Sequence, residues 1–275
     1  MSDLAITAWA ALSAAGEGAP RAPRWAEVDG VKTSRITASI RALWPAAPER
    51  TGRMDRASAH ALLVAQRALS RAEIEADRVR SLAVVVGTAL GCAEVNERYH
   101  RGLVERGAEG ASPILFAQTI PSAPAGEIAI ALGVRGHATT VMAGRASAVA
   151  ALVEARRAIA LGRAEGALVI AGDTLGPDRA RLRSERAQPA AAEAVVALVL
   201  EPVEAVRARG RAPLATLEHA SLRAHDGGDD AHPDWLGASG AVELAAWLDD
   251  PSREARFEHE VRCASGRLGA LRLCR

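Results

Sequence analysis

Hydrophobic residues of this chain gather into short runs, which are separated by longer segments of mixed polarity. The runs are rich in Val, Ile and Leu, and most are continuous instead of alternating with polar residues. Continuous apolar runs of this length are typical of strands that are buried on both faces of a sheet. We therefore predict strands over residues 4–8, 82–86, 167–171 and 195–200, and a strand-like stretch over 268–273.

Two of the intervening segments carry apolar residues at helical spacing. Residues 56–76 carry one such stripe, and residues 146–161 carry another that includes Val149 and Leu152. Because positions i, i+3, i+4 and i+7 share one face of a helix, both segments are predicted to be amphipathic helices. A shorter apolar pattern over 237–248 predicts a further helix. Strands that alternate with helices predict an α/β fold with a layered sheet.

One change in composition suggests how the chain is organised. Residues 223–234 are polar and rich in turn-forming residues, which indicates a loop or linker. We therefore predict a main domain over 1–222. The remainder, 223–275, is expected to contribute a loop, a helix and a final strand that pack on the same domain.

The composition limits the possible functions. Hydrophobic residues make up 49% of the chain and aromatic residues only 3%, so the core is expected to pack small side chains closely. The 34 Lys and Arg residues nearly balance the 33 Asp and Glu residues, and Lys32 is the only lysine. Because no excess of positive charge is available to neutralise phosphates, we do not expect a nucleic-acid binder.

The N-terminal apolar run also argues against a membrane protein. It covers residues 4–15, which is shorter than the ~20 residues that a membrane-spanning helix requires. Asp3 precedes it in place of the basic residues that begin a signal peptide. Three cysteines without metal-site spacing are expected to be reduced thiols. We therefore expect a soluble, cytoplasmic protein.

Four segments between Val84 and Thr174 follow one another as in the N-terminal half of a β-ketoacyl synthase, and the chain resembles that family. They read VVVGTALG from residue 84, SPILFAQTIP from residue 112, TVMAGRAS from residue 140 and LVIAGD from residue 168. The resemblance implies a thiolase-like fold with α/β/α layers. It also implies that the second half of the family's fold is strongly reduced here.

The resemblance places Arg145 where the family has its catalytic cysteine. A ketosynthase needs a thiolate at this helix start to take the acyl chain, and two histidines to assist decarboxylation. The first histidine falls in a region that is missing here, and the second falls at or near Asp234; His232 would need a shifted alignment. The resemblance therefore implies no catalytic residues. It is strongest to chain length factors, the inactive ketosynthase partners of aryl polyene and related type II polyketide pathways.

Chain length factors imply particular partners. The chain is expected to form a heterodimer with a catalytic β-ketoacyl synthase and to meet an acyl carrier protein through that complex, without a cofactor. The helix after Gly91 is expected to face the acyl tunnel or the partner, with ordinary packing as the alternative. The candidate tunnel or interface residues are Leu90, Ala93, Asn96, His100 and Phe116.

Arg145 raises a physical problem that has several solutions. A cation at a helix N-terminus opposes the helix dipole, and a buried cation needs a carboxylate or carbonyl groups as partners. We expect Arg145 to plug the vacant nucleophile pocket while paired with an acid. Contact with the partner subunit is one alternative. Binding of a substrate carboxylate or of the phosphopantetheine phosphate is another.

Other chemistry stays open at this point. A divergent thiolase-fold enzyme, such as a malonyl-carrier decarboxylase or acyltransferase, and a thioester-binding scaffold are the alternative functions. Cys92 is expected to have a packing role, and no His–Asp relay is visible for Ser147. Residues 225–234 hold several metal-ligand types, but in a Gly-rich loop without a rigid frame, so we expect no metal site. These residues are His225, Asp226, Asp229, Asp230, His232 and Asp234.

Overall fold

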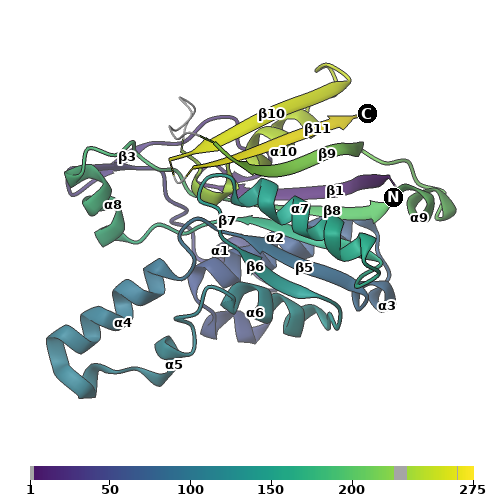
Figure 1. Ribbon diagram of the computed structural model, residues 1–275. Helices are drawn as coiled ribbons and strands as arrows, with labels where there is room; N and C mark the ends of the chain where they lie inside the picture. Colours follow the sequence, from purple (N-terminus) through teal and green to yellow (C-terminus); the bar gives the residue numbers. More distant parts are fainter. Residues whose placement is uncertain (1–2, 226–233, 265) are drawn as a thin grey trace.

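A single nine-stranded sheet carries the fold of the computed structural model, which describes residues 3–225, 234–264 and 266–275 (Figure 1). Its strands follow the order β10-β11-β9-β1-β8-β7-β5-β6, and the short β2 is added beside β1. β5 pairs in parallel with β6 and β7, and the other described pairs of this sheet are antiparallel. The strands are β1 (Leu4–Ser13), β2 (Gly16–Glu17), β5 (Leu82–Gly87), β6 (Ala138–Val141), β7 (Gly166–Gly172), β8 (Ala194–Pro202), β9 (Ala215–Ala224), β10 (Arg256–Cys263) and β11 (Arg267–Cys274).

Helices cover both faces of this sheet, and a separate hairpin of β3 (Ala26–Val28) and β4 (Val31–Thr33) lies at its side. The helices are α1 (Ile40–Leu43), α2 (Arg56–Ala72), α3 (Ala76–Val79), α4 (Ala93–Arg106), α5 (Pro113–Phe116), α6 (Ala123–Leu132), α7 (Ser147–Ala160), α8 (Pro177–Glu185), α9 (Val203–Ala208) and α10 (Ala241–Leu248). No helix within the described ranges is both long and apolar enough to cross a membrane.

The core consists of two main apolar layers, one on each side of the sheet. α2 and α6 pack on one face, and α7 and α10 pack on the other. β5 shows how its sequence serves both layers. Val84 and Val86 point into the α2 layer, whereas Ala83 and Val85 point into the α7 layer. Both faces of β5 are buried, so its sequence does not alternate between apolar and polar residues. This confirms the interpretation of the continuous apolar runs as strands buried on both faces.

The predicted strands and helices are all present, but the short strands β2, β3 and β4 and the strands β6, β9 and β10 were not predicted. β6 is short and half-exposed, and β9 carries polar residues along much of its length. β10 alternates buried and exposed positions, with Phe257 and Val261 buried. The division predicted at residue 222 falls inside β9, which pairs with β1 on one side and β11 on the other. Residues before and after that division therefore belong to one sheet.

Residues 93–116, which we call the arm, project from the body at the lower left of Figure 1. α4 leads outward and the chain returns through Gly110 to α5. Gly102 and Gly110 lie so close that a Cβ atom on Gly110 would be 1.8 Å from the carbonyl oxygen of Gly102, so no other residue fits there. The side chain of Val104 on the arm is 86% exposed, which is unusual for a large aliphatic residue.

We predict that His60 makes the stability of the fold depend on pH. This side chain lies in α2 with 2% exposed, and burial together with the nearby charge of Arg56 lowers its pKa from 6.5 to about 4. A lowered folded-state pKa means that the unfolded chain binds the proton first, so stability is complete above pH 6.5 and is lost as the pH falls toward 4. The loss between pH 7 and pH 4.5 is expected to reach about 2.5 kcal/mol, measured as the free energy of unfolding in urea.

The variant His60→Gln is expected to lose much less stability over this range, because it cannot take up the proton. His219→Gln, at an exposed position on β9, is the matched control and should retain the pH dependence of the unaltered chain. An equal loss in His60→Gln and in the unaltered chain would show that His60 is not the responsible group.

Candidate functional site

Arg145 lies in a tight turn between β6 and α7. Gly144 has a φ of +57°, which favours glycine, and α7 begins two residues after Arg145 at Ser147. The backbone N–H of Ala143 donates to the Ser147 hydroxyl at 2.9 Å, and that hydroxyl lies 2.9 Å from the carbonyl oxygen of Thr88. Ser147 therefore holds the turn against the end of β5.

Asp234 faces Arg145 across this site. Its Oδ1 lies 3.6 Å from Nε of Arg145, and the side chains are 9% and 10% exposed. The Nη2 of Arg183 donates to Oδ2 at 2.5 Å, and the backbone N–H of Leu236 donates to Oδ1 at 2.9 Å. One buried carboxylate is thus shared by two guanidinium groups from different elements. The structure brings together the two positions that the resemblance assigned to the lost nucleophile and the lost second histidine.

Asp173, at the end of β7, joins the loops around this centre. Its carboxylate accepts from the backbone N–H groups of Ala89 at 3.0 Å, Leu90 at 2.7 Å and Gly237 at 2.7 Å, and also from the hydroxyl of Thr88. A Cβ on Gly237 would lie 2.6 Å from the nitrogen of Ala89, so this approach requires glycine. Complete burial raises the pKa of Asp173, although the hydrogen bonds oppose that shift.

Glu193, which precedes β8, ties further segments to the same end of the sheet. The side chain is fully buried and accepts from the backbone N–H groups of Ile36 at 2.7 Å and Leu175 at 2.6 Å. Arg56 binds it through two nitrogens, at 2.7 and 2.5 Å, and Arg35 lies 3.7 Å away. Such a bidentate, fully hydrogen-bonded pair is the arrangement that makes a buried charge tolerable.

The candidate tunnel residues lie on the arm and at its base. Leu90 packs near the small apolar cluster around Leu175, while Ala93 and Asn96 are half-buried on α4. His100 is exposed, and Phe116 is 63% exposed. All five lie within residues 90–116, but within this chain they are not gathered around Arg145. Their role in a tunnel wall stays a prediction.

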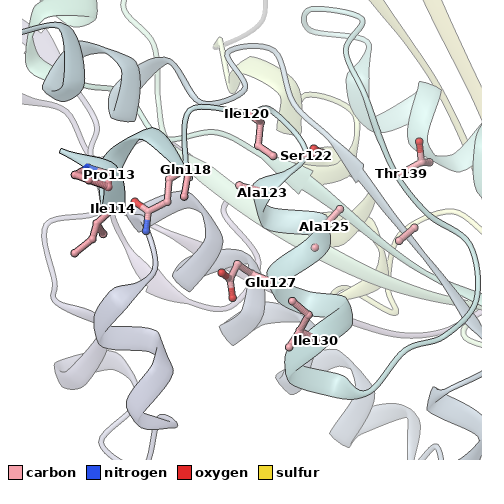
Figure 2. A pocket seen from close by; sticks show the side chains of 13 residues that line it. Pro113, Ile114, Gln118, Ile120, Ser122, Ala123, Ala125, Glu127, Ile130 and Thr139 are labelled. Carbon is pink, nitrogen blue, oxygen red and sulfur yellow. The ribbon is translucent and has the colours of Figure 1, made fainter. Parts of the chain in front are cut away.

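An open groove of about 710 Å³ lies beyond the arm, between α5, α6 and β6 (Figure 2). Large apolar side chains line it while remaining exposed: Ile114 at 69%, Ile120 at 52% and Ile130 at 66%. Glu127 is a charged residue of the lining, and it is paired with Arg50 at 2.5 Å. Sequence reasoning did not find this groove, because exposed and buried isoleucines look the same in a sequence.

β6 forms one end of the sheet and lies beside this groove. Its outer edge pairs with no strand among residues 3–225, 234–264 and 266–275. The next residue after β6, Met142, is 53% exposed. An unpaired strand edge beside exposed aliphatic side chains is the kind of surface that proteins cover with another chain.

The remaining candidate residues offer little chemistry. The Cys92 Sγ contacts the carbonyl oxygen of Thr119 at 3.0 Å, and burial raises the pKa of the thiol, opposite to the shift that an activated cysteine needs. His225 lies 3.0 Å from the carbonyl oxygen of Cys263. No cluster of three or more metal-ligating side chains occurs in the part of the chain that the structure describes. Asp226, Asp229, Asp230 and His232 lie outside the described residues.

Three buried residues of this centre were not predicted from the sequence: Asp173, Arg183 and Glu193. Asp173 carried a signal, since it is a charged residue directly after the apolar run of β7. Arg183 carried none, because it is one of several arginines in α8 and only the fold shows that it reaches Asp234.

Comparison with known proteins identifies related sequences. Residues 7–203 match the family model described as Beta-ketoacyl synthase, N-terminal domain. Nodulation protein E from Rhizobium sp. (strain N33) is 30% identical over 189 residues, which make up 62% of this chain and 47% of that protein. The matched part spans less than half the length of the curated relatives.

Solved structures show the same fold over the whole chain. The ishigamide ketosynthase/chain length factor superimposes with a TM-score of 0.83 at 19% identity, covering 99% of both chains. A type II PKS acyl-carrier protein in complex with its ketosynthase bound to the hexaketide gives a chain with a TM-score of 0.83 at 15% identity, again covering 99% of both. At these identities the likeness concerns the fold, and it confirms the predicted thiolase-like α/β/α arrangement.

We predict that Asp234→Asn destabilises the fold by about 3 kcal/mol, because it removes the carboxylate that two buried guanidinium groups share. The measurement is the free energy of unfolding at neutral pH. Asp77→Asn is the control of equal chemistry, since that side chain is 89% exposed, and it should cost less than about 0.5 kcal/mol. Equal stabilities of the two variants would contradict the structural importance of the shared carboxylate.

Proposed function

The chain belongs to the β-ketoacyl synthase family, and we propose that it is a non-catalytic chain length factor. In this role it pairs with an active β-ketoacyl synthase, shapes the acyl tunnel and limits product length. The proposed setting is type II polyketide biosynthesis of the aryl polyene kind, or a similar fatty-acid-like pathway. The observation that carries the proposal is the buried contact between Arg145 and Asp234 at the positions assigned to the nucleophile and the second histidine.

The chemistry of this pair supports an inactive centre. A thiolate accepts an acyl group because it is a strong nucleophile that can be released again, whereas the Arg145 guanidinium stays protonated at any working pH. Asp234 in turn is held by Arg183 and by the N–H of Leu236. The oxygens of Asp234 are thus engaged by the protein itself, so this carboxylate is not placed to exchange protons with a substrate. We therefore propose that this centre stabilises the subunit and that chemistry occurs on the partner.

The surface beside β6 supports the proposed pairing. A strand edge can be extended by a strand of a second subunit, and the groove with Ile120 and Ile130 adds apolar area for the contact. An acyl carrier protein would reach the complex through the catalytic partner. Without that partner the same surface is expected to promote aggregation.

The position of α4 supports a part in setting product length. Ala93 and Asn96 are spaced i, i+3 on this helix and are half-buried, so their size can change without disrupting the core. In the proposed complex they lie along the wall of the growing chain's tunnel. His100 and Phe116, which are exposed in the single subunit, would be covered by the partner.

We predict that the chain forms a one-to-one complex when it is co-expressed with the ketosynthase encoded nearest to it. Native mass of the purified material is the measurement. Ile130→Asp is expected to lower the yield of complex at least tenfold, because a charge would be buried in the apolar contact. Leu214→Asp, another exposed aliphatic position that lies outside the groove, should leave the complex intact.

The same complex tests the division of labour. Elongation of malonyl units should stop when the catalytic cysteine of the partner is replaced, and it should continue when Arg145 is replaced by Gln in a complex that still assembles. A soluble single chain that acts on acyl-carrier thioesters by itself would contradict the proposal and favour a divergent thiolase-fold enzyme.

We also predict that Ala93→Trp shortens the products of the complex, because the larger side chain would fill the tunnel. Product length is measured by mass spectrometry, and the native mass must stay that of the heterodimer. Arg98→Trp adds the same side chain at an exposed position of α4 and should not change product length. Identical products from both variants would exclude Ala93 from the tunnel wall.

A further inference from the structure

A second pocket, of about 250 Å³, lies between the β3–β4 hairpin and α8. β4 of this hairpin packs against α8, and the hairpin and α8 lie at the left of Figure 1. The floor of the pocket is apolar and includes Leu175, Ala180 and Ala191, which belong to one small buried cluster. This floor gives the pocket a fixed shape. It does not belong to the groove beside β6, which is lined by different residues.

The polar lining of this pocket is cationic. Lys32 and Arg183 contribute to it, together with the neutral side chains of Ser184 and Gln188, and none of the described residues that line it is an Asp or Glu. Lys32 lies over the ring of Trp25, with Nζ 5.1 Å from the ring centroid, and has no ion-pair partner among the described side chains. Two positive charges therefore share one concave surface whose lining holds no acid, and Asp234 pairs with Arg183 from outside that lining.

Arg183 is already held in position. Its side chain is 16% exposed, and Nη2 donates to Asp234 at 2.5 Å and to the carbonyl oxygen of Pro189 at 2.8 Å. Asp234 also faces Arg145, so its single charge does not belong to Arg183 alone. The Nε of Arg183 is shielded from solvent, whereas Nη1 is not and makes no hydrogen bond within the described structure. Because this guanidinium is already held in place and still has an unused donor, it can bind an anion at little cost in side-chain entropy.

We propose that this pocket binds a phosphate group through Lys32 and Arg183. A phosphate carries up to two negative charges, which match the two cations, and its remaining oxygens can accept from Ser184 and Gln188. The group comes either from inorganic phosphate or from an organic phosphate ester, since both present the same oxygens. This assignment does not depend on the proposed function, because it rests on residues outside the groove and the tunnel.

The unique lysine provides a direct test in the full-length chain. The ε-amine of Lys32 is labelled with an amine-reactive reagent, and peptide mass spectrometry follows the rate, with the N-terminal amine as internal reference. Inorganic phosphate at millimolar concentration is expected to slow the labelling of Lys32 at least threefold in a buffer of constant ionic strength. Succinate, a dicarboxylate of similar charge, should slow it much less. Calorimetric titration with phosphate gives the affinity.

Two variants and a control make the result specific. Lys32→Gln and Ser184→Asp are each expected to weaken phosphate binding at least tenfold, the first by removing a charge and the second by adding a repulsive one. Both positions are exposed, so the fold is expected to persist. Arg163→Gln removes a charge at an exposed position outside the pocket and should leave binding unchanged.

The outcomes separate the possible ligands. Tighter binding of pantetheine 4′-phosphate than of inorganic phosphate would identify an ester as the ligand, and the reverse order would identify free phosphate. No protection of Lys32, equal protection by succinate, or unchanged binding in Lys32→Gln would each overturn the proposal. None of these results depends on whether a ketosynthase complex forms, so the two proposals fail or succeed separately.

Discussion

The buried charge of Arg145 is the constraint around which the centre of this protein is arranged. A guanidinium that is 10% exposed at the start of a helix needs carboxylate or carbonyl partners, and Asp234 is one of its partners. Arg183 fixes Asp234 from α8, and α8 is held in turn by the arm, because Arg101 of α4 pairs with Asp178. One charge in the nucleophile position thereby links α7, the segment before η3 (Leu236–Ala238), α8 and α4. A cysteine would have imposed none of these requirements.

The sheet explains why the other buried carboxylates lie where they do. Its central strands β5, β7 and β8 are buried on both faces, so the polar backbone of the loops at their ends is carried into the interior with them. Asp173 and Glu193 satisfy those loops, with three and two backbone N–H donors respectively. Gly237 and Gly176 permit close contacts in these loops. A Cβ on Gly237 would meet the backbone nitrogen of Ala89, and a Cβ on Gly176 would lie 2.0 Å from the Glu97 carboxylate. Fully engaged carboxylates of this kind rigidify a site, and they are poorly suited to moving protons.

The sequence predicted the layers of this fold well because continuous Val-rich runs have few alternatives to a strand buried on both faces. It predicted the central pair less directly: the resemblance located Arg145 and Asp234, but nothing in either local pattern says that their side chains meet. α7 shows a related limit. Its predicted stripe was Val149, Leu152, Val153, Ile159 and Ala160. Val149 and Leu152 are buried as expected, but Ala160 is exposed, and Ala148, Ala151, Ala155 and Ala158 complete the buried face. In a chain with 3% aromatic residues, close approach of small side chains carries the packing, and hydrophobicity alone does not reveal it.

The distribution of polar and apolar groups supports the proposal that this protein acts through its surface. In an enzyme of this family the polar groups at the helix start must remain available to substrate. Here the carboxylate oxygens of Asp234 and Asp173 accept hydrogen bonds from the protein itself. The apolar side chains show the opposite tendency. Ile114, Ile120 and Ile130 stay exposed around a groove next to an unpaired strand edge, at a cost in hydrophobic free energy that the isolated chain does not recover. A centre closed by its own ion pairs, beside a surface left open, is the arrangement expected when a second subunit supplies the chemistry and this one supplies the shape.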